Sequence, residues 1–356
     1  MTNLMGSSNT AHADGLHIPA DLRTHYLLNT NIAKFDESDL IVLVGTNPRM
    51  EAPILNARIR KQTFNRRVQV VGIGPEADLA MENVKWLGND MASVDQFLDA
   101  NSKLHTKIKK AKKPIILFGP SMFTSPELSQ TTIANMEQIV EKLPNVWAKN
   151  ENGEAEWKGL NILQPSASRT AALDLGFVQG PNVDHKAVPK VLIAVGADNE
   201  ATVETINKMK QTHGDESMVI YVGSHGDATA PHADIILPAT AFTEKRVTYV
   251  NAEGRIQKTN KAIGNKHLAQ DDWKIIRALS EVLGAQLPYN TIDEVSQRIS
   301  LVSPTFTEQN SIEQPELMLK YDVKPASNVQ KGEKLQQFLQ NHFMTNAICR
   351  ASPTMA

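Results

Sequence analysis

Short apolar runs that end at a glycine recur along the first two thirds of the chain, and segments of helix length separate them. Each run holds four or five residues, many of them β-branched, and is hydrophobic on both faces. The runs cover residues 40–44, 68–71, 115–118, 191–195 and 219–222, before Gly45, Gly72, Gly119, Gly196 and Gly223. Such runs are typical of parallel strands covered by helices on both sides. The alternation therefore predicts an α/β fold with doubly wound, mainly parallel sheets.

The segments between these runs carry helix signals. Residues 54–64 follow Pro53, which is tolerated in the first turn of a helix. Apolar residues recur at helical spacing over residues 133–143 and stop before a proline. A third helix is expected over residues 272–283, where two aspartates can cap the start and Gly284 can end it.

The character of the chain changes after Pro288. Residues 303–332 contain three prolines and many Glu, Gln, Asn and Ser residues, with few apolar runs. We therefore predict an α/β region over residues 1–290, as one or two lobes. Residues 291–356 are predicted to form an irregular, extended C-terminal tail with one short helix over residues 333–342. Such a tail suits a docking strap better than a second core.

Composition narrows the class of protein. The 356 residues include 37 Lys plus Arg against 39 Asp plus Glu, a net charge of −2, which argues against a nucleic-acid partner. No apolar run approaches the roughly 20 residues of a membrane helix, so no direct membrane span is expected. Cys349 is the single cysteine, which excludes a disulfide framework and a cysteine-ligated zinc or iron–sulfur cluster within this chain.

One glycine pattern suggests a dinucleotide site. Residues 72–77 fit G-x-G-x-x-G/A after a strand, the turn that lets a pyrophosphate reach a helix N-terminus. Pro75 constrains the turn, and no acidic residue closes a second strand at the expected distance. An ordinary turn at the end of a strand is the favoured interpretation, with an NAD-binding dehydrogenase as the alternative.

Two other clusters invite a functional interpretation. His225, Asp227, His232 and Asp234 lie within ten residues and could ligate a metal, although Asp and His also cap backbone groups in Gly/Pro loops. Six lysines over residues 103–113 could hold an acidic partner, and a solvated helix end is the simpler account. No nucleophile elbow or phosphate-binding loop occurs, and no histidine signature surrounds the lone cysteine.

Two longer stretches are more specific. Residues 39–61 contain DLIVLVGTNPRMEAP followed by NARIRK, and residues 233–255 contain ADIILPA, TEK and TYVNAEGR. In collinear order with further stretches, they resemble the molybdopterin oxidoreductase superfamily, in the non-catalytic branch formed by the C-terminal half of the 75-kDa subunits of respiratory complex I. The further stretches are residues 21–32, 171–176, 272–281 and 349–356.

The resemblance implies a fold of the molybdopterin-oxidoreductase type and a structural role. In catalytic relatives, glycine-ended strands hold a molybdopterin guanine dinucleotide, and residues 45–48 (GTNP) match one such strand end. Complex I relatives are understood to have lost this cofactor, so we expect side chains to fill the pocket. We expect no catalytic, cofactor-binding or metal-ligating residue in this chain. Iron–sulfur clusters are expected in the N-terminal half of the subunit or in a partner chain.

The resemblance also implies partners and a location. The chain would be a subunit, or the C-terminal part of one, of the proton-translocating NADH:ubiquinone oxidoreductase, beside the cluster-bearing half, the flavoprotein module and small accessory subunits. The expected location is the matrix side of the mitochondrial inner membrane, or the cytoplasmic face in a bacterium. The alternative is a fragment of a catalytic, molybdopterin-dependent oxidoreductase of the formate or nitrate type.

Overall fold

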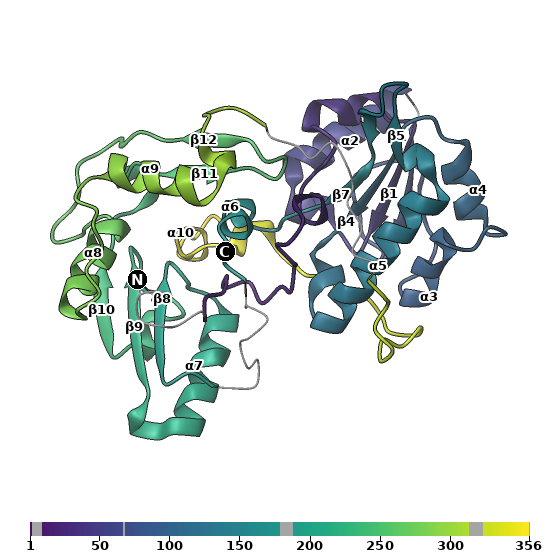
Figure 1. The fold of residues 1–356 in the computed structure, drawn as a ribbon. Coiled ribbons are helices and arrows are strands. Elements are labelled where there is room, and N and C mark those ends of the chain that lie inside the picture. Colours follow the sequence, from purple (N-terminus) through teal and green to yellow (C-terminus); the bar gives the residue numbers. More distant parts are fainter. Residues whose placement is uncertain (2–8, 67, 179–187, 313–322, 356) are drawn as a thin grey trace.

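A five-stranded parallel sheet forms the centre of the first of two lobes (Figure 1). The computed structural model describes residues 1, 9–66, 68–178, 188–312 and 323–355. The strands, in sheet order, are β3 (Val84–Trp86), β2 (Gln69–Ile73), β1 (Leu40–Val44), β4 (Pro114–Phe118) and β7 (Leu160–Ile162). The three predicted strands of this lobe are confirmed, with boundaries shifted by at most two residues.

Helices cover both faces of this sheet. They are α1 (Pro48–Glu51), α2 (Pro53–Arg66), α3 (Met91–Val94), α4 (Lys103–Lys110) and α5 (Pro126–Lys142). Along β1, Val42 and Val44 belong to the larger hydrophobic core, while Ile41 and Leu43 belong to a second core on the opposite face. Every residue of β1 and β4 is buried. The predicted helices over residues 54–64 and 133–143 correspond to α2 and α5.

The second lobe has a smaller parallel sheet, in the order β10 (Ile235–Pro238), β9 (Met218–Gly223) and β8 (Val191–Val195). Helix α7 (Glu200–His213) lies against one face, and α8 (Asp272–Val282) and α9 (Ile292–Val302) belong to the same lobe (Figure 1). Val191 and Val195 of β8 are exposed. Helices therefore lie on both faces of this sheet, as predicted, but their cover is incomplete at β8.

Short elements link the two lobes. They are the hairpin β11–β12 (Thr248–Val250 and Ile256–Lys258) and helix α6 (Arg169–Asp174), whereas the hairpin β5–β6 (Trp147–Lys149 and Ala155–Lys158) packs in the first lobe. Arg23 forms a two-pronged ion pair with Asp174, with nitrogen–oxygen distances of 2.9 and 3.0 Å, and the Tyr26 hydroxyl donates to the same carboxylate. Burial is the main cause that raises the pKa of Tyr26 above its usual value, so the phenol keeps its proton.

The end of the chain departs from the prediction. Residues 333–341 form no helix in the structure but an extended segment; a 3-10 turn follows at His342–Met344 and the short helix α10 at Ala347–Arg350. Helix α9 lies in the stretch predicted as extended, and residues 313–322 of that stretch lie outside the described residues. The division of the chain near residue 290 stays a prediction. Among the described residues, no helix combines the length and apolar character of a membrane span.

Candidate functional site

The first sheet has a topological switch point at its central strand. From β1 the chain moves to β2 and β3 on one side and then returns to β4 and β7 on the other. In open parallel sheets, ligands bind outside the carboxyl ends of the strands where the order reverses. Here that place is formed by residues 45–51 after β1 and residues 119–121 after β4, which we call the switch-point edge.

The glycines of the switch-point edge allow its segments to lie in direct contact. A Cβ atom added at Gly119 would lie 2.3 Å from Cβ of Thr46, so only glycine fits there. Gly45 has a φ of +58°, and an added Cβ would lie 2.9 Å from Cγ of Met122. These glycines therefore serve the packing of the ends of β1 and β4 against each other.

A buried carboxyl group lies at the same edge. Glu51 ends helix α1, and its Oε2 lies 2.5 Å from the Thr46 hydroxyl, which donates to it. The other oxygen, Oε1, is buried without a hydrogen-bond partner. Burial raises the pKa of Glu51 to about 7, against the weaker opposing effect of the hydrogen bond from Thr46.

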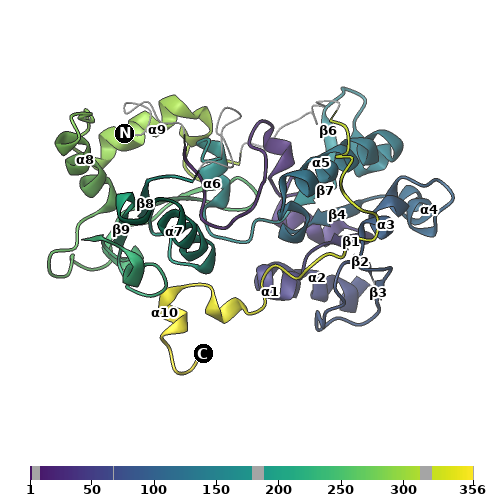
Figure 2. The same ribbon diagram turned by 90° about the horizontal axis from the view of Figure 1, so that it is seen from below.

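Residues 331–350, which we call the C-terminal strap, run across this part of the first lobe (Figure 2). The hydroxyl of Ser121 donates to the carbonyl of Gln336 at 2.5 Å. Leu335 is 3% exposed and belongs to the main hydrophobic core. A ring nitrogen of His342 lies 3.0 Å from the carbonyl oxygen of Met50. The strap thus occupies the switch-point edge.

Backbone hydrogen bonds hold the start of the strap. The N–H of Met91 donates to the carbonyl of Glu333 at 3.1 Å, and the N–H of Ala92 donates to the carbonyl of Lys331 at 2.8 Å. These donors stand at the start of α3, where backbone N–H groups have no partner within the helix. The strap therefore supplies acceptors for the first two backbone N–H groups of α3.

The other end of the strap is attached to the second lobe. The guanidinium of Arg350 lies 2.5 Å from the carboxylate of Asp227 and also donates to the carbonyl of Asp198 at 3.0 Å. Asp198 follows β8 and Asp227 follows β9. The strap therefore connects the carboxyl ends of the strands in both lobes.

The predicted dinucleotide turn does not have the required structure. Gly72 lies inside β2, where an added Cβ would lie 2.3 Å from the ring of Trp86. The residues after β2 form a loop up to residue 83 and no helix. Because a pyrophosphate is bound by a helix N-terminus in such motifs, the NAD interpretation of residues 72–77 is wrong.

The His/Asp cluster has other partners. Asp227 binds Arg350, and Asp234 accepts the backbone N–H of Val219 at 2.7 Å. His225 contacts the hydroxyl of its neighbour Ser224. In the described part of the chain, no group of three or more His, Cys, Asp or Glu side chains could hold a metal. These contacts agree with the alternative interpretation, in which the Asp and His side chains bind backbone groups and neighbouring side chains of the loop.

The lysine run covers α4 and the residues after it and ends just before β4. Lys113 pairs with Glu37 at 2.5 Å, and the backbone N–H groups of Lys112 and Lys113 donate to Asp39. Most of the six lysines are exposed, and Lys107 is half-buried. The exposed lysines agree with a solvated helix end, and the acidic-partner alternative stays a prediction.

Cys349, the single cysteine, lies half-buried in α10.

The YVNAEGR stretch has a structural role that the sequence pattern did not reveal. Glu253 is buried, and its carboxylate accepts the backbone N–H of Ile32 at 2.9 Å and contacts Arg255 at 3.2 Å. Gly254 has a φ of +86° beside the Arg23 guanidinium. This turn joins the β11–β12 hairpin to the first lobe.

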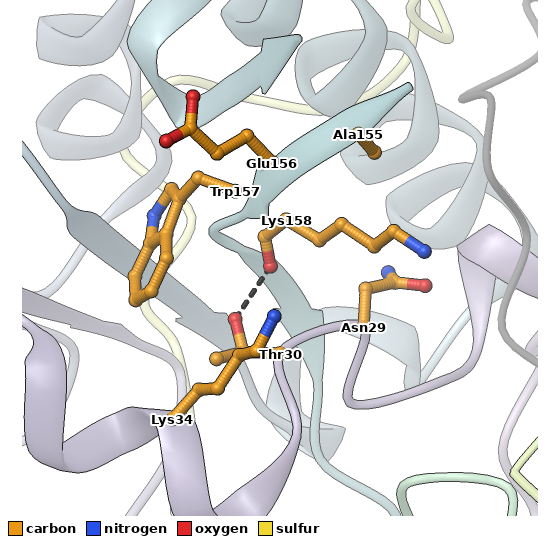
Figure 3. A pocket seen from close by; sticks show the side chains of 7 residues that line it. All are labelled: Asn29, Thr30, Lys34, Ala155, Glu156, Trp157 and Lys158. Carbon is orange, nitrogen blue, oxygen red and sulfur yellow. Dashed lines mark hydrogen bonds between the residues drawn. The ribbon is translucent and has the colours of Figure 1, made fainter. Parts of the chain in front are cut away.

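A cavity of about 170 Å³ lies away from the switch-point edge (Figure 3). Its lining is Asn29, Thr30, Lys34, Ala155, Glu156, Trp157 and Lys158. The Trp157 indole donates to the carbonyl of Pro114, the first residue of β4, so the cavity lies at the amino ends of the strands. Its Thr30 hydroxyl donates to the Lys158 carbonyl at 2.5 Å, and the Asn29 amide donates to two backbone carbonyls, so these groups stabilise the loops around it.

Comparison with known proteins agrees with the sequence resemblance. A profile for the C-terminal region of an NADH-ubiquinone oxidoreductase subunit matches residues 311–356. The NADH-ubiquinone oxidoreductase 75 kDa subunit of Reclinomonas americana is 36% identical over 341 residues, which cover 95% of this chain and 47% of that protein. The mitochondrial 78 kDa subunit of Neurospora crassa is 36% identical over 367 residues, covering 100% of this chain and 47% of that protein.

Three further matches are informative. The iron-sulfur protein 1 of the mitochondrial NADH dehydrogenase [ubiquinone] of Solanum tuberosum is 36% identical over 361 residues. The chain spans about half the length of these relatives. Acetylene hydratase from Pelobacter acetylenicus aligns with 80% of this chain at 12% identity and a TM-score of 0.45. The molybdopterin oxidoreductase profile matches residues 1–282, and the chain belongs to this family.

Proposed function

We propose that this chain is a structural part of a 75-kDa-type subunit of respiratory complex I, without an active site of its own. It supports the iron–sulfur electron path from NADH to ubiquinone, which runs through another part of the subunit. The observation that carries the proposal is the closed switch-point edge, where Thr46 contacts Gly119 and the strap covers Ser121. The similarity to 75- and 78-kDa subunits supports the choice of complex I.

The molybdopterin cofactor of the family does not fit this edge. A dinucleotide would need the space between the ends of β1 and β4, where an added methyl group at Gly119 already overlaps Thr46. It would also meet Gln336 of the strap and the buried Glu51 carboxyl, which offers a phosphate no positive charge. The arrangement therefore favours the structural role over the catalytic alternative.

The proposal also includes the position of the iron–sulfur clusters and the neighbouring subunits. Iron–sulfur clusters lie in the other half of the subunit or in a partner chain, and the flavoprotein module and small accessory subunits are further neighbours. The location is the matrix side of the mitochondrial inner membrane, as the mitochondrial relatives suggest. The chain itself contributes a rigid body and no catalytic, cofactor-binding or metal-ligating residue.

A native pull-down of the tagged chain from its source membranes tests the proposal, with mass spectrometry and metal analysis of the recovered material. The expected result is co-purification of cluster-bearing and flavin-bearing complex I chains, with iron and without molybdenum. Recovery of a free chain with stoichiometric molybdenum would establish the catalytic alternative and contradict the proposal.

A further inference from the structure

The sheet of the second lobe is covered unequally on its two faces. Helix α7 covers one face with Ile206 and Met209. On the other face, Ile275 of α8 packs in a small cluster with Ile220 and Val222. Parallel sheets of α/β proteins are normally covered on both faces. In the part of the chain that the structure describes, only this small cluster lies on the second face, so the cover of that face is incomplete.

Apolar side chains from all three strands are exposed on that second face. They are Val191 (54% exposed), Val195 (44%), Met218 (43%) and Ile235 (41%). Residues two apart along a strand share a face, and Ile220 pairs with both Ile193 and Ile235. The four exposed side chains therefore lie on the face that holds Ile220, which we call the open face.

Such a face is typical of a contact surface. Exposed apolar patches on folded proteins mark sites of interaction, because burial of apolar area is the main driving force of association. The sequence of β8, which is apolar on both faces, fits a strand that is covered on both sides once its partner is bound.

The relatives point to one occupant. About half the length of each matched relative lies outside the region of similarity, and the C-terminal profile matches the end of this chain. In those relatives the other half therefore precedes the matched region. The first part of this chain lies against the second lobe, since the Asn199 amide donates to the carbonyl of Ala13 at 2.7 Å. Figures 1 and 2 both place the N-terminus beside α8, the helix that reaches the open face.

We propose that the open face of β8, β9 and β10 is the docking surface for the cluster-bearing half of the subunit. An apolar layer of that half covers Val191, Met218 and Ile235 and completes the second side of the sheet. The proposal rests on the proposed function above and adds the surface by which the two halves meet.

Two neighbouring residues of β10 provide a matched test. Ile235 lies on the open face, and Ile236, 54% exposed, lies on the opposite face of the same edge strand. Tagged wild type, Ile235→Glu and Ile236→Glu are purified from source membranes, and the cluster-bearing half is quantified by mass spectrometry and iron content. We expect Ile235→Glu to lower recovery about tenfold or more, because a charge is buried in an apolar contact. Ile236→Glu should stay within about twofold of wild type. Equal melting temperatures of the two isolated variants exclude unfolding as the cause.

Footprinting of Met218 gives a readout that holds even where both halves form one polypeptide. Hydroxyl radicals should oxidise Met218 readily in the isolated chain and about tenfold more slowly in the assembled complex. Equal oxidation of Met218 in both states, or undiminished recovery with Ile235→Glu where the halves are separate chains, overturns the assignment of the surface while the proposed function stands. Protection of Met218 in the isolated chain that rises with its concentration assigns the face to a second copy instead. A wild-type chain that recovers no complex I subunit overturns the proposed function and this surface with it.

Discussion

The two lobes are built from the same strand–helix pattern but bury their strands differently. In the first lobe, β1 and β4 are buried at every position, whereas β8 in the second lobe has only Ala194 buried. Among the described residues, two large hydrophobic side chains are exposed in the first lobe, and twelve are exposed between Val191 and Val302. The two are Ile54 and Phe64; the twelve are Val191, Val195, Met218, Ile235, Ile236, Phe242, Ile263, Leu268, Val282, Leu283, Leu301 and Val302.

This difference shows that the formation of a strand and the burial of its side chains have separate causes. Strand propensity and apolar runs depend on local sequence, and they are alike in β1 and β8. The burial of strand side chains depends on neighbouring helices and loops. The first lobe contains enough of these elements to bury its strands, and the second lobe does not. Apolar residues that lie open in one lobe therefore indicate a missing neighbour rather than a weak strand.

The largest expected effect distinguishes the cores of the two lobes. Phe118 on β4 is fully buried, with its ring 6.3 Å from that of Phe97. Phe118→Ala should lower the free energy of unfolding of the first lobe by about 3–5 kcal/mol, because a large cavity remains. Val195→Ala on β8 should cost less than about 1 kcal/mol, because that side chain is half exposed. Hydrogen exchange in denaturant, followed separately for β1 and β9, measures both changes; similar costs would contradict the comparison.

The second effect concerns the buried carboxyl of the first lobe. The pKa of Glu51 is about 7 in the folded chain, above its ordinary 4.5, so the folded state holds the proton more tightly. The stability that this proton contributes is full below pH 4.5 and is lost as the pH rises to about 7, a change of about 3 kcal/mol. Glu51→Gln should remove this pH dependence and make the first lobe more stable than wild type at pH 8.

Denaturant unfolding between pH 5 and pH 8 measures this effect. Glu37→Gln is the matched control, because Glu37 is exposed beside Lys113, which lowers its pKa. That control should leave the fall in stability between pH 5 and pH 7 unchanged. A Glu51→Gln variant with the same fall as wild type would show that Glu51 is ionised in the folded chain.

The third effect tests the strap. Leu335→Ala should weaken strap attachment by about 2–3 kcal/mol, since the side chain is buried in the main core. The backbone N–H groups of Met91 and Ala92, which donate to strap carbonyls, should then exchange faster. The N–H groups of β9 in the second lobe serve as the internal control and should be unaffected. Unchanged exchange at Met91 and Ala92 would mean that Leu335 does not hold the strap.

The smallest effect concerns the link from the strap to the second lobe. Arg350→Gln removes the ion pair with Asp227, which is partly exposed, so it should cost less than about 1 kcal/mol and less still at high salt. Limited proteolysis within residues 341–350 measures the release of that end. Lys190→Gln, which removes an exposed pair with Glu216 in the same lobe, is the control. Equal proteolysis of both variants would show that the strap end is held by other contacts.

Local sequence predicted most of the first lobe and little of the strap. Strands before Gly45 and Gly119 and helix α2 follow from apolar runs and Pro53. The strap has no periodic pattern, and its placement depends on single contacts such as Ser121 to Gln336 across 215 positions of the chain. The buried state of Glu51 likewise results from tertiary packing, and the GTNPR stretch just before it offers only the family resemblance as a signal.

The strap also changes how any molecule could reach the switch-point edge. A ligand must compete with a segment that is covalently tethered nearby, and tethering of this kind corresponds to effective concentrations in the millimolar range. If the strap is closed about 99% of the time, the apparent dissociation constant of a ligand for the open edge rises about a hundredfold. The strap thus acts as a competitor for the switch-point edge that belongs to the chain itself. A change in the length of the segment that precedes the strap would change access to the edge while every residue that lines the edge stays the same.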